Sequence, residues 1–502
     1  MLALVCGTFA TMSFGATVYF APEARGAADG SSAENAKVFS MTEINKCKEG
    51  SVIQLCDGKY SFSGQNQFTC TKFVFQGNPT DRSAVEFDGG GNAQFSISDR
   101  PGVTIKDVTI RRANSTGGAI SLSGTTVALI ENCAFISCTN ANYGGAIRVA
   151  STSGNVVSNC YFESCKATSG GGAISLERKA YVYDCYFTNN VCVAGGALFL
   201  RDTSQDGSVI SGCEFVGNAS ERGSNTSGHG GVLQAAKSFY MTNCVFTANT
   251  SLGLGSVIRL SAGNGGTVSG CLFNGNKMTG TSACGGVIAV EAGTFEVDRC
   301  TFQDNTSATY AAGVFQRESK TSHVKIRNSL FVGNVAVGRG NSVFVGDNNA
   351  NSSTVVENCT FVDNKCSNNS GDGFAPVRAN SGPLSVTNCA FWNNTDKSGK
   401  LWAATAATAP TIAYTAADAT LTGDGCVPLT ASPFTDAANG DYTLPKKVGG
   451  APNPCLGAGV KLDWMTKDSK DLAGNPRLRG DDIVDLGCYE FFQKSGVYLI
   501  FR

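Results

Sequence analysis

The stretch from Gly171 to Asn190, which reads GGAISLERKAYVYDCYFTNN, decides the fold. It opens on a Gly-Gly-small-apolar motif and closes on a polar-Cys-x-Phe-x-x-Asn motif. Gly and Asn favour turns, and the apolar residues between them are arranged in short runs typical of strands. No helical period fits these segments, so the stretch predicts two or three short strands separated by turns.

Both motifs recur along the chain about every 28 residues. A unit of this size cannot bury its apolar side alone, whereas stacked copies bury a continuous core. We therefore predict an all-β fold, a right-handed parallel β-helix of roughly ten to twelve coils. Copies of the second motif begin at residues 132, 159, 184, 212, 243, 270, 299, 328, 358 and 388.

The second motif predicts ladders of identical residues. Its Cys and Phe are two positions apart, so both side chains point to one face of the strand. Stacking in register at ~4.8 Å then places Cys above Cys and Phe above Phe in the interior. The last Asn of the motif falls at the following turn. We expect an Asn ladder there, because Asn tolerates left-handed backbone and bonds turn amides.

The chain contains 21 Cys, a count that also suits a disulfide framework. Interior free thiols are the favoured interpretation, because stacked cysteines with parallel Cβ vectors lie somewhat too far apart for a disulfide. Cys138 and Cys165 replace the turn Asn on adjacent coils and are the best candidates for a bridge.

The repeat and its flanks predict four segments. Residues 1–16 are apolar, end in small residues and resemble a secretory signal peptide. Residues 17–60 form an N-terminal cap, with a short helix near 37–47, Ser40 or Thr42 as its N-cap, and the first strand at 51–55. Residues 61–400 form the repeats, and residues 401–502 form an irregular coil and a closing region.

Composition limits the function classes. The net charge of −1 gives no electrostatic case for nucleic acid. The two His residues make histidine or zinc chemistry unfavoured, and no run after the signal peptide is long and apolar enough to be a transmembrane segment. We expect a monomer that is secreted or held at the cell surface.

The sequence also resembles known bacterial families. The Gly-Gly-Ala-Ile and Phe-x-x-Asn motifs resemble the polymorphic outer membrane protein repeats of surface adhesins. The C-terminal stretches SPFTDA (432–437), DLAGNPR (471–477) and VDLGCYE (484–490) are similar to the closing loop of the choice-of-anchor Q group. The resemblance covers nearly the whole mature chain. It implies a pectin lyase-like β-helix and is weak for activity.

Candidate site residues lie on outward positions between the motifs. Glu291, Glu318 and Asp347 recur one per coil, which would set neighbouring carboxylates ~5 Å apart and the outer pair ~10 Å apart, near the separations in glycosidases. They are the candidate catalytic residues, although solvated strand-end residues are the favoured interpretation. We predict no metal site and no cofactor; Ca²⁺ is the one ion that such a cluster would suit. Candidate substrate contacts are Arg148, Arg259, Arg378 and Phe199. The alternative role of the three arginines is to keep a long β surface soluble.

Two functions remain open from the sequence. The leading prediction is an adhesin-like protein that binds a glycan or another cell-surface ligand without catalysis. The alternative is a polysaccharide lyase or glycoside hydrolase, pectate-lyase-like or polygalacturonase-like, acting on acidic polysaccharide along the lateral face. Fold alone does not choose between them.

Overall fold

The computed structural model describes residues 15–492 except 153, 202, 204–206, 222–227, 262–264, 282–284, 318–319, 339–341, 346–350, 368–375, 380–382, 396–410 and 481. Its contacts divide the chain into two units. The first comprises Met1–Thr267 and Phe273–Thr294, and the second comprises Val268–Leu272 and Phe295–Arg502. Three strands span the division: β33 (Gly265–Ser269), β34 (Leu272–Asn274) and β37 (Gly293–Asp298).

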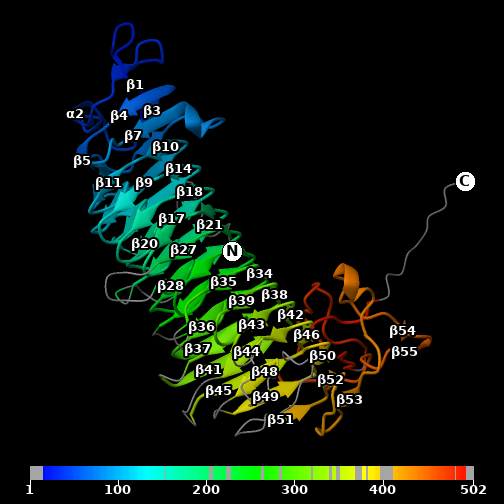
Figure 1. Cartoon of the computed structure of the whole chain (residues 1–502). Helices are drawn as coiled ribbons and strands as arrows, with labels where there is room; N and C mark the ends of the chain where they lie inside the picture. Colours follow the sequence, from blue (N-terminus) through cyan, green and yellow to red (C-terminus); the bar gives the residue numbers. More distant parts are fainter. Residues whose placement is uncertain are drawn as a thin grey trace, which may run out of the picture. The chain divides into compact units, whose positions relative to one another are not determined.

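The first unit is a stack of coils whose strands form parallel sheets (Figure 1). Sheet 1 runs through β2 (Lys37–Val38), β1 (Thr17–Ala21), β3 (Val52–Leu55), β6 (Val74–Gln76), β9 (Pro101–Lys106), β13 (Val127–Glu131), β17 (Asn155–Ser158), β21 (Ala180–Tyr183), β25 (Ser208–Ser211) and β29 (Phe239–Thr242). Sheet 2 runs through β4 (Gly58–Ser61), β7 (Val85–Asp88), β10 (Thr109–Arg111), β14 (Ala134–Ile136), β18 (Tyr161–Glu163), β22 (Tyr186–Thr188), β26 (Glu214–Val216) and β30 (Val245–Thr247).

The other two sheets of the first unit carry the Gly-Gly strands and the short turn strands. Sheet 3 runs through β5 (Gly64–Phe68), β8 (Ala93–Ser98), β12 (Ile120–Ser123), β16 (Ile147–Val149), β20 (Ile174–Leu176), β24 (Leu198–Leu200), β28 (Leu233–Ala235), β32 (Ile258–Leu260) and β36 (Ile288–Val290). Sheet 4 runs through β11 (Asn114–Ser115), β15 (Thr139–Asn140), β19 (Lys166–Ala167), β23 (Val191–Cys192), β27 (Ala219–Ser220), β31 (Thr250–Ser251) and β35 (Lys277–Met278).

Left-handed residues turn the chain at the two ends of the sheet 2 strands from β10 to β30. Asn132 (φ 49°) and Asn159 (φ 51°) precede the interior Cys, and Asn189 (φ 53°) precedes the ladder residue Asn190. Asn and Gly adopt positive φ at low cost, which explains why the motif begins with Asn, Asp or Gly in most coils. The left-handed position predicted for the ladder Asn is therefore one residue too late.

The predicted interior ladders are confirmed. In the first unit the rings of Phe135, Phe162, Phe187, Phe215, Phe246 and Phe273 stack face to face, with centroids 4.7–5.0 Å apart. The 19 described cysteines are free thiols, so the suggested bridge between Cys138 and Cys165 is wrong. Each of these two thiols donates to a carbonyl of the preceding coil, Cys138 to Ile110 and Cys165 to Phe135, both at 3.5 Å.

The Asn ladder is a directional chain of hydrogen bonds. The Oδ1 atom of Asn218 accepts from the backbone N–H (3.0 Å) and the Nδ2 (2.9 Å) of Asn190 on the preceding coil. Its own Nδ2 donates to the Phe187 carbonyl at 2.9 Å and to Asn249 Oδ1 at 3.1 Å. Asn190, Asn218, Asn249 and Asn276 are fully buried, so the ladder satisfies backbone groups that water cannot reach.

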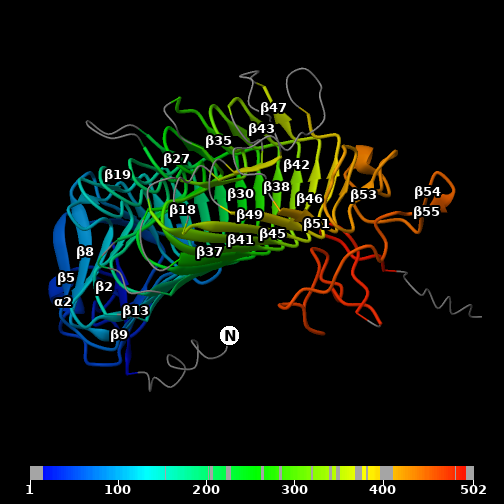
Figure 2. The ribbon, with the colours of Figure 1, turned by 90° about the horizontal axis from the view of Figure 1, so that it is seen from below.

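The N-terminal cap differs from the prediction in two respects, one of which is the extent of the helix: Lys37 and Val38, expected in a helix near 37–47, form the strand β2. The helix is α2 (Met41–Ile44), which contacts β5 (Figure 2), and the Ser40 Oγ accepts from the Glu43 N–H at 3.2 Å. Of the two predicted N-cap residues, Ser40 and Thr42, the structure has Ser40. The expected first strand, 51–55, is instead the third, because β1 and β2 precede β3 in the same sheet. The signal peptide prediction falls on residues 1–16, of which only 15 and 16 are described, and it stays a prediction.

The second unit repeats the same coil. Sheet 1 continues in β41 (Ser322–Arg327), β45 (Ser353–Glu357), β49 (Leu384–Thr387) and β51 (Thr411–Ala413), and sheet 2 in β38 (Thr301–Gln303), β42 (Leu330–Val332), β46 (Thr360–Val362), β50 (Ala390–Trp392), β52 (Ala416–Ala417) and β53 (Val427–Pro428). Sheet 3 includes β40 (Val314–Gln316), β44 (Val343–Val345) and β48 (Val377–Ala379), and sheet 4 includes β39 (Thr306–Ser307), β43 (Val335–Ala336) and β47 (Lys365–Cys366).

A closing region covers the outer face of sheet 2 in this unit. It contains η2 (Ala437–Asn439) and the antiparallel pair β54 (Lys447–Val448) and β55 (Ala451–Pro452). Its apolar residues pack against outward residues of β42, β46 and β50, which explains why these strands are apolar on both faces. The buried cluster is Leu330, Val332, Val362, Ala390, Ala416, Leu429, Phe434, Leu444, Cys455, Leu486 and Cys488.

Candidate ligand-binding face

The outward positions of sheet 3 in the first unit follow the predicted register. Arg148, Ser175, Phe199, Gln234 and Arg259 occupy the middle of β16, β20, β24, β28 and β32 and pair in that order. The flanking residues of these strands are fully buried, so the middle residues face outward. Three predicted contact residues, Arg148, Phe199 and Arg259, therefore lie on one lateral face.

Five side chains of this face form one connected group, here called the lateral cluster: Tyr143, Arg148, Glu177, Phe199 and Arg201. Glu177 Oε1 accepts from Arg148 Nε at 2.8 Å and lies 3.0 Å from Arg201 Nη1. The Arg201 guanidinium lies 4.2 Å from the centroid of the Tyr143 ring, which stacks on Phe199 at 5.9 Å. The cluster joins charge pairing, a cation–π contact and aromatic stacking in one place.

Small residues on the intervening coil allow Phe199 to contact Tyr143. Tyr143 and Phe199 come from coils that are two steps apart, with Gly170 and Ser175 between them. A Cβ at Gly170 would lie 2.2 Å from the Phe199 ring, and Ser175 is fully buried. The absence of a side chain at Gly170 therefore lets Phe199 lie over the middle coil and reach Tyr143.

Electrostatics keep Glu177 ionised. Burial raises the pKa of Glu177, but the hydrogen bonds and positive charges of Arg148 and Arg201 outweigh it, so this pKa lies below its ordinary value. Two guanidinium groups share one carboxylate, which leaves the lateral cluster with a positive charge in excess. Tyr143 was not predicted; its only sequence signal is a large ring directly before a Gly-Gly motif.

A second ion pair between an arginine and a glutamate lies farther along the same face. Arg259 Nε donates to Glu291 Oε2 at 2.7 Å, and Arg259 Nη1 donates to Gln234 Oε1 at 3.3 Å. Both members of the ion pair are largely buried. Glu291 is thus an arginine-bound carboxylate, whereas Glu318 and Asp347 lie outside the described residues. The predicted catalytic group of three carboxylates stays a prediction.

The strand register of the second unit differs in part from the outward positions that the repeat predicts for sheet 3. Phe315, Phe344 and Arg378 pair in the middle positions of β40, β44 and β48. Counting from the Gly-Gly motif of this coil places Gln316 at the outward position, but Gln316 is buried and donates to the Ser322 carbonyl at 2.8 Å. In this coil Ala311, with a left-handed φ of 33°, occupies the position of the first Gly of the motif. The middle of the strand is therefore Phe315, one residue before the position counted from the sequence. Arg378 is largely buried, and its contact with a ligand stays a prediction.

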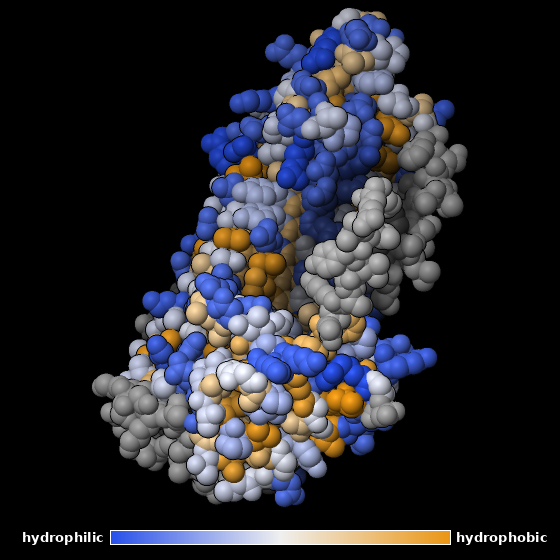
Figure 3. Space-filling model, turned by 90° about the vertical axis from the view of Figure 1, so that its right-hand side faces the viewer, coloured by the Kyte–Doolittle hydropathy of each residue, from blue (hydrophilic) through white to orange (hydrophobic). Residues whose placement is uncertain are grey.

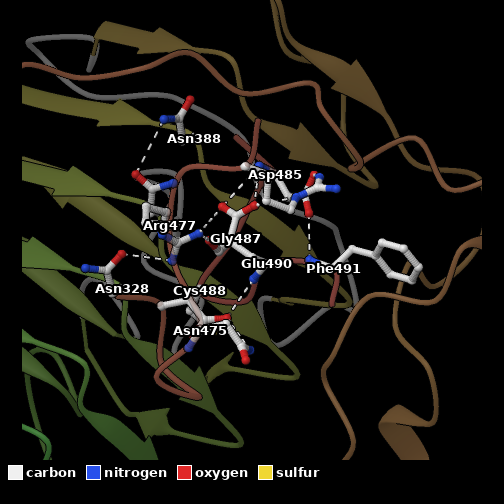
Figure 4. Close-up of polar contacts among 12 residues, drawn as sticks. Asn328, Asn388, Asn475, Arg477, Asp485, Gly487, Cys488, Glu490 and Phe491 are labelled. Atoms are coloured by element: carbon white, nitrogen blue, oxygen red, sulfur yellow. Dashed lines mark hydrogen bonds and ion pairs between the residues drawn. The ribbon is translucent and has the colours of Figure 1, made fainter. Parts of the chain in front are cut away.

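A second charged group is buried under the closing region of the second unit (Figure 4). Arg477 Nη1 lies 2.8 Å from Glu490 Oε1, and Arg477 Nη2 donates to Asn328 Oδ1 at 2.8 Å. Arg479 pairs with both Asp485 and Glu490. Burial raises the pKa of Glu490 to about 8. The side chains of Arg477, Asp485 and Glu490 are fully buried, which bars a substrate, so this group fastens the closing region to the coils.

Comparison with known proteins agrees with this architecture. A family model described as right handed beta helix region matches residues 83–257. The chain is a right-handed parallel β-helix repeat protein. The finer resemblances of this β-helix to the polymorphic outer membrane protein repeats and to the choice-of-anchor Q group stay predictions. No curated protein matches the sequence significantly.

Several solved structures are similar to this chain at low identity. Pectate lyase Pel9A is 13% identical over 96% of this chain and 97% of its own, with a TM-score of 0.30. A mannuronic acid specific polysaccharide family 6 lyase from human gut microbiota is 11% identical over 85% of this chain and 90% of its own, with a TM-score of 0.41. The PL6 family alginate lyase AlyGC is 11% identical over 86% of this chain and 58% of its own, with a TM-score of 0.40.

Proposed function

We propose that this β-helix binds an acidic polysaccharide along sheet 3 of its first unit, outside the cell and without catalysis. The observation that carries the proposal is the lateral cluster. It presents partly exposed aromatic rings and two arginines, from coils that are two steps apart, on a rigid parallel ladder. Aromatic rings offer apolar faces to sugar rings, and guanidinium forks match the geometry of a carboxylate.

Charge and rigidity favour a polymer with carboxylate groups. The excess positive charge of the lateral cluster attracts an anionic chain. Its side chains are already held by Glu177, Tyr143 and the stack of coils, so little side-chain freedom is lost on binding. On the side of the molecule that lies to the right in Figure 1, hydrophobic residues lie in small groups among hydrophilic ones (Figure 3).

The chemistry of the face argues against catalysis by the described residues. Its two described carboxylates, Glu177 and Glu291, are each bound to arginine. A general acid needs a raised pKa, whereas the pKa of Glu177 is lowered. In the described part of the chain, no helix is long and apolar enough to span a membrane, and no group of His, Cys, Asp and Glu side chains is suited to hold a metal.

The proposal is tested by measuring binding and turnover on the same polymers. Polygalacturonate, alginate and neutral dextran would be offered to the wild type and to a double variant, Arg148→Met with Arg201→Met, by affinity electrophoresis and calorimetry. We expect the double variant to lose about tenfold or more in affinity for an acidic polymer. Arg111→Met is the matched control, because Arg111 pairs with Glu86 at 2.7 Å on sheet 2.

Two results would overturn the proposal. One is the absence of saturable binding to either acidic polymer, or equal affinity in the wild type and the double variant. The other is the release of new reducing or unsaturated chain ends that disappears in Glu291→Gln or Glu318→Gln, which would establish an enzyme instead.

A further inference from the structure

A separate hollow lies at the N-terminal end of the first unit. It has a volume of about 700 Å³, which is within the ~300–1,000 Å³ typical of small-molecule sites. α2 and the residue before its cap form one wall, and the β4–β5 turn and the turn after β7 form the others. Its lining shares no residue with the lateral cluster.

The floor of the hollow is aromatic and rigid. Phe62 is buried and stacks on Phe95 at 4.7 Å, and it meets Phe87 edge to face at 5.6 Å. Phe39 meets Phe87 at 5.2 Å and Tyr60 at 5.3 Å, and part of its surface stays exposed. Rings fixed in this way present an apolar surface that does not need to rearrange when a ligand arrives.

The rim of the hollow carries polar groups with no net charge. Asp88 Oδ1 accepts from Arg112 Nε at 2.9 Å and from the Gly90 N–H at 3.1 Å, and Arg112 Nη2 pairs with Asp88 Oδ2. The Arg112 guanidinium holds the pKa of Asp88 below its ordinary value, so the pair stays ionic at neutral pH. The Asn66 Nδ2 donates to the carbonyls of Ser63 and Gly64, which fixes its amide at the rim.

The mouth of the hollow opens beside a glycine turn. Gly90 has a φ of 58°, and a Cβ built on it meets nothing within 4 Å. Exposed hydroxyl groups of Ser61, Ser63 and Thr42 surround the opening. A ligand that fits must have an apolar face for the rings and several hydroxyl groups for the rim. An anion gains little, since the only charged side chains of the lining neutralise each other.

We propose that this hollow binds one or two rings of an uncharged sugar. The apolar C–H face of the sugar lies against Phe39 and Phe62, and its hydroxyl groups bond the Asp88–Arg112 pair, Asn66 and the serines. This site is independent of the polysaccharide face, because it differs in residues, in charge and in ligand class. The protein would then hold acidic chains on its side and a neutral sugar at its N-terminal end.

The experiment measures binding of small neutral sugars to the full chain. Saturation transfer NMR and calorimetry would be run with glucose, galactose, mannose, cellobiose and maltose, and with galacturonate as the charged counterpart. Ser63→Trp fills the mouth from an exposed position, and Gln303→Trp is the matched control on β38, outside the lining. We expect saturable binding of at least one neutral sugar, lost about tenfold or more in Ser63→Trp and unchanged in Gln303→Trp.

The outcomes separate this site from the lateral face. Sugar binding that persists in the Arg148→Met, Arg201→Met double variant supports two independent sites, even if no acidic polymer binds. No saturable binding of any neutral sugar would overturn the inference, as would equal binding in Ser63→Trp and wild type. Preference for galacturonate over the neutral sugars would overturn it as well.

Discussion

Substitution of Asn218 by Ala tests the Asn ladder. The change removes four hydrogen bonds, two accepted by Oδ1 and two donated by Nδ2, at a side chain that is fully buried. Two of the groups left behind keep other partners: Asn190 Nδ2 still donates to the Phe162 carbonyl, and Asn249 Oδ1 still accepts from the backbone N–H of residue 218.

One of the remaining two groups also keeps a partner: the Phe187 carbonyl lies in the parallel ladder between β22 and β26, whose register offers it the backbone N–H of Val216. The Asn190 backbone N–H is then the group that loses its bond to residue 218 inside a dry core. An unsatisfied buried group costs ~1–3 kcal/mol, so we expect Asn218→Ala to lower the free energy of unfolding by about that amount. The wide range reflects how far the neighbouring coils relax into the space.

The assay is urea unfolding followed by circular dichroism, with hydrogen exchange of amides on both sides of the ladder. Asn189→Gly is the matched control, because Asn189 is exposed and left-handed and the equivalent residue in the next coil is Gly217. We expect the control to change the unfolding free energy by under ~1 kcal/mol. If Asn218→Ala behaves like Asn189→Gly, the ladder does not stabilise the coils as reasoned here.

Three further predictions concern buried charge and thiols. Above pH ~8, where Glu490 is ionised, Arg477→Met leaves its buried carboxylate without the closest cation and should cost ~3–5 kcal/mol in urea unfolding. We expect a smaller loss in Arg479→Met, whose side chain is partly exposed, and equal losses would contradict the prediction. Because the pKa of Glu490 rises on folding to about 8, its contribution to stability is full below pH ~4.5 and fades as the pH approaches 8, so wild type should lose stability relative to Glu490→Gln over that range, and parallel pH profiles would refute this. In the native protein iodoacetamide should label Cys47, which is partly exposed, well before the buried Cys160, as read by peptide mass spectrometry, and equal rates would refute the interior ladder.

The interior could be predicted from the sequence because the repeat imposes it. Residues in register must stack on their own kind, so the positions of Cys, Phe and Asn in one coil predict those in the next. The pairing of Phe135 with Phe162 and of Asn190 with Asn218 follows directly. The strand β1 was missed because its residues directly follow the predicted signal peptide and belong to no copy of the motif.

The outward contacts could be predicted less well, since they break the nearest-neighbour rule. Phe199 reaches Tyr143 across an intervening coil, which depends on the missing side chain at Gly170 rather than on any period. The bond from Arg477 to Asn328 joins positions 149 residues apart, and the closing region has no repeat to predict it. The outward position was misassigned to Gln316 because the Gly-Gly motif of that coil is degraded, so the sequence does not show where its strand begins.

The directionality of the Asn ladder bears on how such a chain changes in length. Each ladder residue bonds only the coil before it and the coil after it, and the acceptor and donor roles are the same at each step. Duplication of one coil therefore adds one more identical link and leaves the bonds of every other link as they were. Deletion of a coil rejoins two ends that already match. The length of this protein is thus free to drift by whole coils, whereas insertion of a few residues inside a coil is admitted only where the turns face solvent.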